Sequence, residues 1–582
     1  MGGLIGVVMI VKDEEDKLRA CLDSVKNIVD EIVIVDTGSV DKTVDIARTY
    51  TDKIYSYPWQ EDFSAARNFA IDKCSCKWIL SLDADEHLET GAGDLRVLIT
   101  DTASEAFFIP LKNCISPSGS DFNEIGVLRL FRNLPQYRFF GKIHEQISIT
   151  DQELVRFSNY PVIIHGYIEP GRRQNKRRRN ISMITEQLKR QPENQEFLKY
   201  YLGCEWLELG KYQQAYECFW SAYNKLDSTH IFFRSSVIRN LIACLRHMGK
   251  FEEALTLCMR ETEVYPEYTD LFFDGGVVLE QMGEYEIARR WFKIAIDLGT
   301  PCILYQHSNG TEDFLAYYHL GHCCQTIGKS EEASQYYQAA LQHNKNFIYP
   351  LYGLYMVLAT RESCEKIISY FSKQGYIESY ESRQALGQLL FASGRPDLAV
   401  KVCMQAEGLT MLSCELAKYS LYSGNFKQAL DVLQKLKTGS QQNNAEILKT
   451  EILAYIFMRD ISTAQVKCLE MWRHQTMRAE ALSLMALIKR LEGRQQTHIT
   501  KYEPGFVEHL LNIMADCLRS YSEDSGVFIH VAKCCEELIS QFEEGSRTLF
   551  AFWQREIKGV EMLLDIRYQN MRGLYSWKKR GP

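Results

Sequence analysis

The long C-terminal part of this chain repeats one short pattern at intervals that suit a stack of helix pairs. The pattern has six positions. A glycine comes first, a variable residue second and, in most copies, an aromatic residue third; two more residues and an alanine follow. Three clear copies are Gly210–Ala215, Gly249–Ala254 and Gly283–Ala288. It recurs with variation at Gly328–Ala333, Gly394–Ala399, Gly424–Ala429 and, with arginine in place of glycine, Arg459–Ala464. Successive copies start 39, 34, 45, 66, 30 and 35 residues apart.

Each residue of the pattern has a physical role in a helical hairpin. Glycine ends one helix and permits a tight turn, the aromatic residue packs across the turn, and the small alanine lets paired helices approach. The intervals cluster near the 34-residue period of tetratricopeptide repeats. We therefore predict an all-α tetratricopeptide-type solenoid with insertions, and one degenerate unit inside the 66-residue interval. Residues after about 500 are helical by pattern without a clear repeat.

Composition agrees with this division and excludes several classes. Six of the 13 prolines precede residue 192, and the other seven are spread over the remaining 391 of the 582 residues. The net charge of −8 argues against general nucleic-acid binding. No segment reaches the roughly 20 apolar residues of a membrane span, and the N-terminus lacks the basic start of a signal peptide. We expect a cytoplasmic protein.

The first 110 residues alternate short apolar runs with amphipathic stretches, which is typical of βαβ units. Apolar runs at 4–11, 31–36 and 78–82 predict strands of a parallel sheet covered on both faces. Beyond Ala106 the strand-like pieces predict a mixed or antiparallel extension of that sheet. The predicted domains are an α/β domain at 1–170, a basic linker or lid with the first helix at 171–195, repeats at 196–470 and a helical region at 471–582.

Polar side chains follow three of the predicted strands, where open α/β sheets bind ligands. They are Lys12-Asp13-Glu14, Asp36-Thr37-Gly38-Ser39 with Asp41 beyond, and Asp83-Ala84-Asp85-Glu86. Neither a G-x-G-x-x-G loop nor a Walker lysine motif is present, so a Rossmann dehydrogenase or a P-loop NTPase is disfavoured. Alternate carboxylates at a strand end can reach a hydroxyl and a metal together. The alternative is a solvated acidic turn.

Four segments together resemble the family 2 glycosyltransferases of GT-A fold, in order and spacing over residues 4–90. They are VVMIVKDEEDKLRACLDSV, EIVIVDTGSVDKT, FSAARNFAIDKC and WILSLDADE. Within that family the chain is similar to bacterial enzymes that join this domain to tetratricopeptide repeats, a group that includes the sublancin-type peptide S-glycosyltransferases. The fold that the resemblance implies is an α/β GT-A domain followed by the helical solenoid.

The resemblance also implies roles for individual residues. Asp36 would bind the nucleotide base, commonly uracil, and Asp83 would contact the ribose and the donor sugar. Asp85 would ligate Mg²⁺ or Mn²⁺ bridging the diphosphate of a UDP-sugar. Arg67 stands where relatives carry an arginine near the donor, and its structural alternative is a salt bridge within the acidic pocket. Asp13 replaces the asparagine of many relatives, so a direct ligand role there is doubtful.

Three further places are candidates on the acceptor and metal sides. Glu145, with His144 second, falls where the family's acceptor-side base usually lies; the alternative is a structural strand-end pair. His165 ends a strand and could complete the metal site, although such histidines are often structural. In the basic run Arg172–Arg179, Lys176 or nearby arginines could bind the diphosphate from a lid, and the alternative is a solvated helix start.

The 18 cysteines are scattered through a large chain, where thiols normally stay reduced and act as small hydrophobic residues. The pairs Cys74/Cys76, Cys323/Cys324 and Cys534/Cys535 lack the spacing of zinc ligands, so we do not expect them to bind metal.

The sequence thus predicts a metal-dependent, inverting glycosyltransferase that moves a sugar from a nucleotide sugar to a peptide or protein bound by the repeat array. The array could instead dimerise the enzyme or dock it on a cell-envelope assembly, which leaves a glycan or a lipid-linked acceptor. The alternative from another class is a tetratricopeptide scaffold whose N-terminal domain is inactive.

Overall fold

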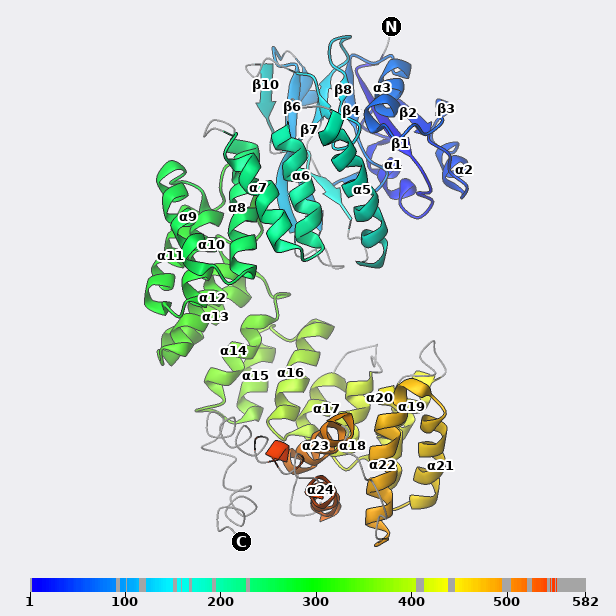
Figure 1. Ribbon diagram of the computed structural model, residues 1–582, viewed down its shortest axis with the longest axis vertical. Coiled ribbons are helices and arrows are strands. Elements are labelled where there is room, and N and C mark those ends of the chain that lie inside the picture. The colour runs from blue at the N-terminus through cyan, green and yellow to red at the C-terminus, as the bar shows by residue number, and fades with distance from the viewer. Residues whose placement is uncertain are drawn as a thin grey trace. The chain divides into compact units, whose positions relative to one another are not determined.

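The computed structural model describes residues 3–89, 95–100, 102–114, 122–149, 154–158, 160–166, 170–190, 195–226, 231–404, 413–437, 445–494, 504–520 and 526–541, with residues 545, 547–549 and 551. The side chains of residues 170–176 lie outside this description. The chain divides into two compact units, Met1–Ile327 and Gly328–Pro582 (Figure 1). None of the described helices is both long and apolar enough to cross a membrane.

A mixed sheet forms the N-terminal part of the first unit. Its main path runs in the order β3-β2-β1-β4-β7-β6-β11-β5, with β10 paired to β6 and β12 paired to β7. The strands are β1 (Ile5–Val11), β2 (Glu31–Asp36), β3 (Ile54–Ser56), β4 (Trp78–Ser81), β5 (Glu86–Leu88), β6 (Ala106–Cys114), β7 (Phe122–Arg132), β10 (Val155–Phe157), β11 (Ile163–His165) and β12 (His307–Ser308), and β8 (Phe139–Phe140) pairs separately with β9 (Gln146–Ile147).

The direction of the strands confirms the predicted architecture. Strands β1 to β4 pair in parallel, whereas β7 runs antiparallel to both β4 and β6. Helix α1 (Leu18–Val25) buries its apolar stripe against one face of the sheet, and α3 (Phe63–Lys73) buries Ala70 and Ile71 against the other. Short helices α2 (Thr43–Ala47) and α4 (Leu95–Ile99) also pack on the α1 side. Because both faces are covered, the strands are apolar on both sides.

Helices follow the sheet within the same unit. They are α5 (Pro170–Arg190), α6 (Gln195–Glu208), α7 (Tyr212–Tyr223), α8 (Ile231–His247), α9 (Phe251–Val264), α10 (Thr269–Gln281), α11 (Tyr285–Leu298) and α12 (Phe314–Thr326). In two helix pairs, a glycine of the first helix packs against an aromatic ring of the second. A Cβ added to Gly203 would lie 2.7 Å from the Phe219 ring, and a Cβ added to Gly276 would lie 2.7 Å from the Phe292 ring. The predicted helix pairs are therefore confirmed, with the close approach that small residues allow.

The turn residues of the repeat adopt the left-handed backbone conformation that the pattern predicts. Gly210, Gly249 and Gly283 have φ of 69°, 73° and 84°, and Arg459, which replaces the glycine in the last copy, has φ of 62°. For a residue other than glycine, this left-handed conformation costs about 1–2 kcal/mol of conformational free energy.

Replacing Gly249 with alanine should lower the free energy of unfolding by about 1 kcal/mol. No atom lies within 4 Å of the added Cβ, so backbone strain alone causes the loss. Urea unfolding followed by circular dichroism measures the effect. The matched control is Gly526→Ala, where space is equally open and φ is ordinary. Equal effects at both positions would contradict the strain argument.

The 45-residue interval of the repeat contains an insertion that joins the array to the sheet. Strand β12 pairs antiparallel with β7, His307 opposite Glu124 and Ser308 opposite Asn123. The Ser308 hydroxyl donates to Asn123 Oδ1 at 2.9 Å and accepts from Arg239 of α8 at 2.8 Å. Since an isolated two-residue strand has little stability of its own, these polar bonds hold the insertion on the edge of β7.

Like Arg239, His307 is a basic side chain at this junction, and it is buried. Its Nδ1 lies 2.8 Å from Asp270 of α10 and its Nε2 lies 3.2 Å from Glu312, while Arg239 also pairs with Asp270. Burial acts to lower the pKa of His307, but the bonds to Asp270 and Glu312 outweigh it and raise the pKa to about 10.

Raising the pH should therefore loosen the insertion. Because the folded pKa lies above the unfolded one, the stabilisation is complete below about pH 6.5 and is lost as the pH rises towards 10. Each pH unit in that window should increase local opening by up to about tenfold. Hydrogen exchange of residues 305–311, corrected for the intrinsic rate, measures it. In His307→Gln the corrected rate should be high and independent of pH; a pH-dependent rate in that variant would assign the effect to another group.

The second unit is entirely helical in the residues described. Its helices are α13 (Ser330–His343), α14 (Tyr349–Leu358), α15 (Cys364–Gln374), α16 (Tyr380–Ala392), α17 (Pro396–Met404), α18 (Cys414–Tyr422), α19 (Phe426–Lys437), α20 (Ala445–Phe457), α21 (Ile461–Trp472), α22 (Arg478–Leu491), α23 (Pro504–Arg519) and α24 (Gly526–Ile539), with a 3-10 turn η2 (Gln475–Met477). Helices α14 and α15 are the degenerate unit predicted inside the 66-residue interval.

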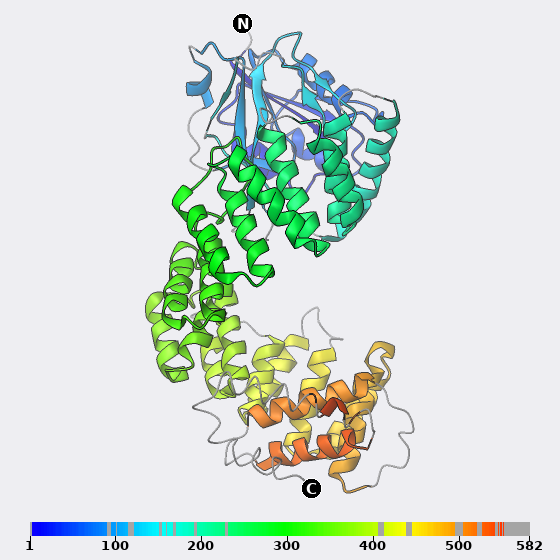
Figure 2. The same cartoon turned by 60° about the vertical axis from the view of Figure 1, so that its left-hand side comes forward.

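The last two helices do not extend the repeat pattern. Phe528 of α24 packs against Tyr422 of α18 and Phe457 of α20, with ring centroids 5.8 and 4.9 Å apart. Lys418 of α18 pairs with Asp516 of α23 at 2.6 Å. Within the second unit, α23 and α24 thus cross the first helices of the final helix pairs (Figure 2).

Candidate active site

The loops that follow β1 and β2 are joined by side-chain to backbone hydrogen bonds at the carboxyl edge of the sheet. Asp36 ends β2, is almost fully buried, and accepts from the amides of Gly38 and Ser39. Asp13 accepts from the amide of Val40 at 2.8 Å, and its own amide donates to the Ser39 hydroxyl. Asp13 therefore has a local structural role, as its doubtful ligand status suggested. Asp36 lies in the ordered loop where a nucleotide base was predicted.

Asp83 follows β4 and lies between two arginines. Arg67 of α3 donates to Asp83 Oδ1 at 2.5 Å, and Arg129 of β7 donates to Asp83 Oδ2 at 2.9 Å. Burial opposes ionisation of Asp83, but the two guanidinium groups outweigh it and hold its pKa below the ordinary range. Asp83 is therefore a carboxylate whose orientation is set from both sides.

Arg129 was not among the predicted site residues. The β6–β7 register shifts so that Phe107 opposes Leu130 and Phe108 opposes Leu128, which leaves Arg129 as the extra residue of a β-bulge. Bulges turn a side chain out of the regular alternation. Arg129 consequently reaches Glu86 at 2.6 Å as well as Asp83. Because register depends on the partner strand, no local sequence signal marks this residue.

Asp85 directly precedes β5 and His165 ends β11, the strand paired with β5, although 80 residues separate the two in the chain. His165 Nε2 lies 3.2 Å from Asp85 Oδ2, and Lys17 of α1 approaches the same oxygen at 3.7 Å. Burial opposes ionisation of Asp85, yet the hydrogen bond from His165 keeps the pKa of the carboxyl below its ordinary value. Both side chains retain some exposure, 15% and 24%. A carboxylate and an imidazole at this separation form a donor pair that suits Mn²⁺ or Mg²⁺.

Glu145 and His144 lie on the loop between β8 and β9. Glu145 accepts a hydrogen bond from Arg67 Nε, so Arg67 joins Glu145 to Asp83. His144 has φ of 52° and stacks on Tyr201 of α6, with ring centroids 3.8 Å apart and planes 3° apart. The first helix of the array thus contacts the residue next to the predicted base. Sequence reasoning did not anticipate Tyr201.

The predicted basic lid is only partly within the described structure. The side chain of Lys176 lies outside the described residues. Arg177 of the same run pairs with Glu205 and Glu208 of α6, at 3.1 and 2.8 Å. These two ion pairs link α5 to α6.

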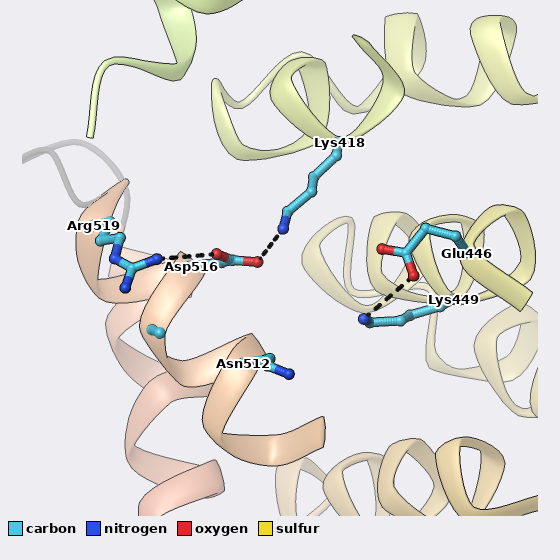
Figure 3. A pocket seen from close by; sticks show the side chains of 7 residues that line it. Lys418, Glu446, Lys449, Asn512, Asp516 and Arg519 are labelled. Atoms are coloured by element: carbon cyan, nitrogen blue, oxygen red, sulfur yellow. Dashed lines mark ion pairs between the residues drawn. The ribbon is translucent and has the colours of Figure 1, made fainter. Parts of the chain in front are cut away.

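A hollow of about 370 Å³ lies elsewhere, in the second unit (Figure 3). Its lining residues are Lys418, Glu446, Lys449, Asn512, Ala515, Asp516 and Arg519. Lys418 and Arg519 both face Asp516, and Lys449 faces Glu446. Since its cations and carboxylates pair with one another, the hollow does not present the ligand set of a diphosphate. The strand-end carboxylates of the first unit remain the candidate site.

Two family models match the chain. Residues 6–99 match the model of glycosyl transferase family 2, and residues 315–347 match a tetratricopeptide repeat model. The chain therefore carries a family 2 glycosyltransferase domain and tetratricopeptide repeats, which confirms the resemblance and the fold class derived from the sequence.

Individual relatives are named either as glycosyltransferases or as a TPR repeat-containing protein. The chain is 28% identical over 288 residues to the SPbeta prophage-derived glycosyltransferase SunS of Bacillus subtilis, covering 47% of this chain and 66% of SunS. It is 40% identical over 145 residues to a TPR repeat-containing protein of Synechococcus elongatus, covering 25% and 35%. An uncharacterized glycosyltransferase of Rickettsia typhi is 28% identical over 155 residues, covering 27% and 49%. The chain thus spans less than two thirds of each of these relatives.

Proposed function

We propose that this protein is a metal-dependent, inverting glycosyltransferase that transfers a sugar from a nucleoside diphosphate donor, UDP by preference, to a peptide or protein. The observation that carries the proposal is the pairing of Asp85 with His165 beside the Arg67–Asp83–Arg129 set, at the carboxyl ends of β4 and β11. The family 2 model over residues 6–99 and the similarity to SunS support it.

The metal requirement rests on the donor set. Asp85 and His165 come from different strands, lie in contact and remain partly open to solvent, so a cation can replace the hydrogen bond between them. Asp85 and His165 would hold a divalent cation, which would supply Lewis-acid stabilisation of the leaving nucleoside diphosphate. Lys17, 3.7 Å from Asp85, can turn from the carboxylate to a phosphate oxygen when the donor is bound.

The remaining residues position donor and acceptor. Asp36 binds the base from the loop after β2, and Asp83, oriented by its two arginines, accepts hydrogen bonds from ribose and sugar hydroxyls. Glu145 takes the proton from the acceptor nucleophile as that atom bonds to the anomeric carbon and the bond to the diphosphate breaks. Attack from the face opposite the diphosphate inverts the configuration. Arg67 donates to both Glu145 and Asp83 and so orients the two carboxylates toward the same site.

The polypeptide acceptor is supported by the junction between the two parts of the first unit. Tyr201 on α6 contacts the loop that carries Glu145, and β12 extends the sheet beside β7. A helical array that begins at the acceptor side of the site can guide an extended chain towards it. SunS, to which the chain is 28% identical over 288 residues, is named a glycosyltransferase.

Incubation with radiolabelled UDP-glucose, UDP-galactose and UDP-N-acetylglucosamine in Mn²⁺ tests the proposal. Release of UDP is expected with at least one donor, and Glu145→Gln should still bind UDP but not transfer. If no donor is hydrolysed or transferred, and Asp85→Ala leaves UDP binding unchanged, the chain is a scaffold. Intact mass spectrometry of proteins made with and without this chain identifies the acceptor: a hexose-sized shift on a polypeptide supports our assignment, whereas sugar on lipid or glycan alone overturns it.

A further inference from the structure

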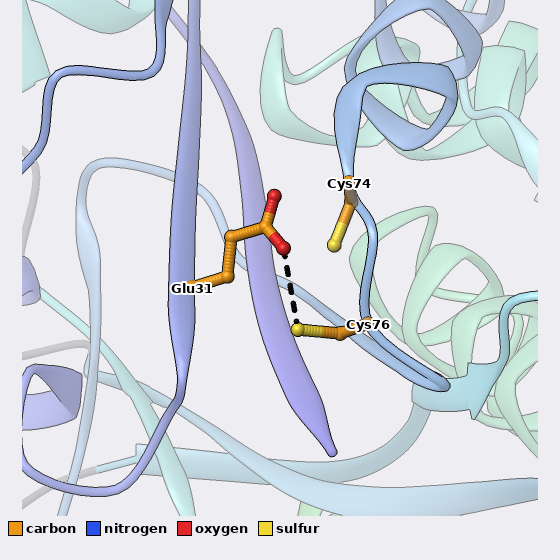
Figure 4. A group of neighbouring side chains, drawn as sticks. All are labelled: Glu31, Cys74 and Cys76. Atoms are coloured by element: carbon orange, nitrogen blue, oxygen red, sulfur yellow. Dashed lines mark hydrogen bonds between the residues drawn. The ribbon is translucent and has the colours of Figure 1, made fainter. Parts of the chain in front are cut away.

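Two cysteines and a glutamate meet at the opposite edge of the sheet from the strand-end carboxylates. Cys74 and Cys76 lie on the turn between α3 and β4, and Glu31 begins β2 (Figure 4). One ligand atom from each of the three residues lies within 4.8 Å of the other two. Cys76 Sγ is 3.4 Å from Glu31 Oε2. Such separations are those expected of ligands that share one small cation.

The surrounding backbone leaves space for the two sulfur atoms. An added Cβ at Gly6 of β1 would lie 2.3 Å from Cys74 Sγ, and one at Gly3 would lie 3.0 Å from Cys76 Sγ. Gly6 is the one glycine in an otherwise apolar central strand, which marks a close approach of a neighbouring group. The two thiols therefore lie against the bare backbone of β1.

Hydrogen bonds fix the turn that carries the thiols. The side-chain amide of Asn133 donates to the carbonyls of both Cys74 and Cys76, at 3.1 and 3.0 Å. The amide and hydroxyl of Ser75 donate to Glu31 Oε2, at 3.0 and 2.6 Å. The three ligand residues are thus preoriented by bonds that do not use the sulfur atoms. Preorganisation of this kind is what the outer contacts of a metal site supply.

We propose that Glu31, Cys74 and Cys76 bind a thiophilic divalent cation of the zinc class. Two thiolates and a carboxylate are ordinary zinc ligands, and water would fill the fourth tetrahedral position. The interval between Cys74 and Cys76 lacks the spacing of zinc ligands, and on the sequence alone this argued against zinc. Glu31 comes from a strand 43 residues earlier than Cys74, so only the folded chain completes the set. The site is separate from the glycosyltransferase chemistry and holds the turn between α3 and β4 to β2.

Lys53 competes with the cation for the same carboxylate. Its ammonium lies 2.7 Å from Glu31 Oε1, and the Lys53 side chain is 44% exposed. Because the lysine is free to turn into solvent, its removal should strengthen cation binding while having little effect on packing. Removing Lys53 should therefore raise the affinity for the cation, whereas removing the ligand Glu31 should lower it.

Titration of the full-length, reduced protein with Co²⁺ tests the site, since thiolate coordination gives a charge-transfer absorption band in the near ultraviolet. The wild-type protein should bind about one more equivalent than Cys74→Ser/Cys76→Ser, and Zn²⁺ should displace it. Glu31→Gln should weaken binding about tenfold or more. Lys53→Met should strengthen it severalfold, a gain that a purely structural role of Glu31 does not explain.

Cys534→Ser/Cys535→Ser is the matched control, because this pair is also buried but is not among the grouped metal-ligating side chains of the described structure. Its Co²⁺ stoichiometry should equal that of the wild type. If the serine variant of Cys74 and Cys76 does not fold, the Glu31 and Lys53 variants still decide the question. Equal Co²⁺ dissociation constants for the wild-type protein, Glu31→Gln and Lys53→Met would overturn the proposal. Finding Cys74 and Cys76 joined as a disulfide in the protein purified under non-reducing conditions would also overturn it.

Discussion

Asp85→Asn is expected to lower kcat/KM for sugar transfer by about 10³, roughly 4 kcal/mol of transition-state stabilisation. The substitution keeps the shape of the side chain and a hydrogen bond to His165, but it removes the negative charge with which Asp85 would bind the proposed cation. The Mn²⁺ concentration for half-maximal activity should rise in parallel. Release of UDP from the donor identified in the nucleotide-sugar experiment, measured across a Mn²⁺ series, reports both quantities.

Asp23→Asn is the matched control for this substitution. Asp23 is an exposed carboxylate on α1 that pairs with Lys26, away from the strand ends. Its loss should change kcat/KM by less than about twofold, since an exposed pair contributes little. Melting curves should show that both variants are folded. Wild-type activity with unchanged Mn²⁺ dependence in Asp85→Asn would remove Asp85 as the metal ligand.

Arg129→Met should destabilise the first unit by about 3–5 kcal/mol. Arg129 is the positive partner of both Asp83 and Glu86, and Glu86 is only 2% exposed. Removing one member of a buried ion pair leaves an uncompensated charge, which costs far more than the pair itself contributes. Burial already raises the pKa of Glu86, so the orphaned carboxyl should take up a proton in the variant. Thermal unfolding monitored at pH 7 measures the loss.

A double substitution separates this charge effect from lost packing. Arg129→Met/Glu86→Gln should recover part of the stability, because the second change removes the unpaired acid. Arg361→Met is the control: Arg361 pairs with Glu331 at 3.2 Å, but both side chains are exposed, and the expected change is below about 0.5 kcal/mol. A similar loss in Arg129→Met and Arg361→Met would refute the role of burial.

The sequence predicted the edge of the sheet at which Asp36, Asp83 and Asp85 gather, because carboxyl ends of parallel strands meet at one edge. It also singled out Arg67, His165 and Glu145. The contacts among them were beyond sequence reasoning: Arg67 lies between Asp83 and Glu145 rather than serving only one of them. The structural and donor-side alternatives for Arg67 are therefore compatible, since one guanidinium can orient the carboxylates and face a donor.

Three features depended on pairing between distant segments. The bulge at Arg129 comes from the register of β7 on β6, β12 comes from a repeat insertion added to β7, and the Glu31 cluster needs β2 beside the turn before β4. In each case the residue types are unremarkable in their own neighbourhood. Their contacts are made with residues that lie far away in the sequence.

By itself the sequence determined the helix-pair array and the alternating α/β domain, because both follow from local periodicity. Turn glycines and small helix-contact residues predict helix pairs, and short apolar runs predict strands, whatever the rest of the chain does. Tertiary structure alone decided which charges pair, which side chains leave a strand at a bulge, and which thiols meet a carboxylate. The physical reason is that electrostatic and coordinate bonds depend on separations of a few ångströms, and strand register, which sets those separations, is a property of two segments together.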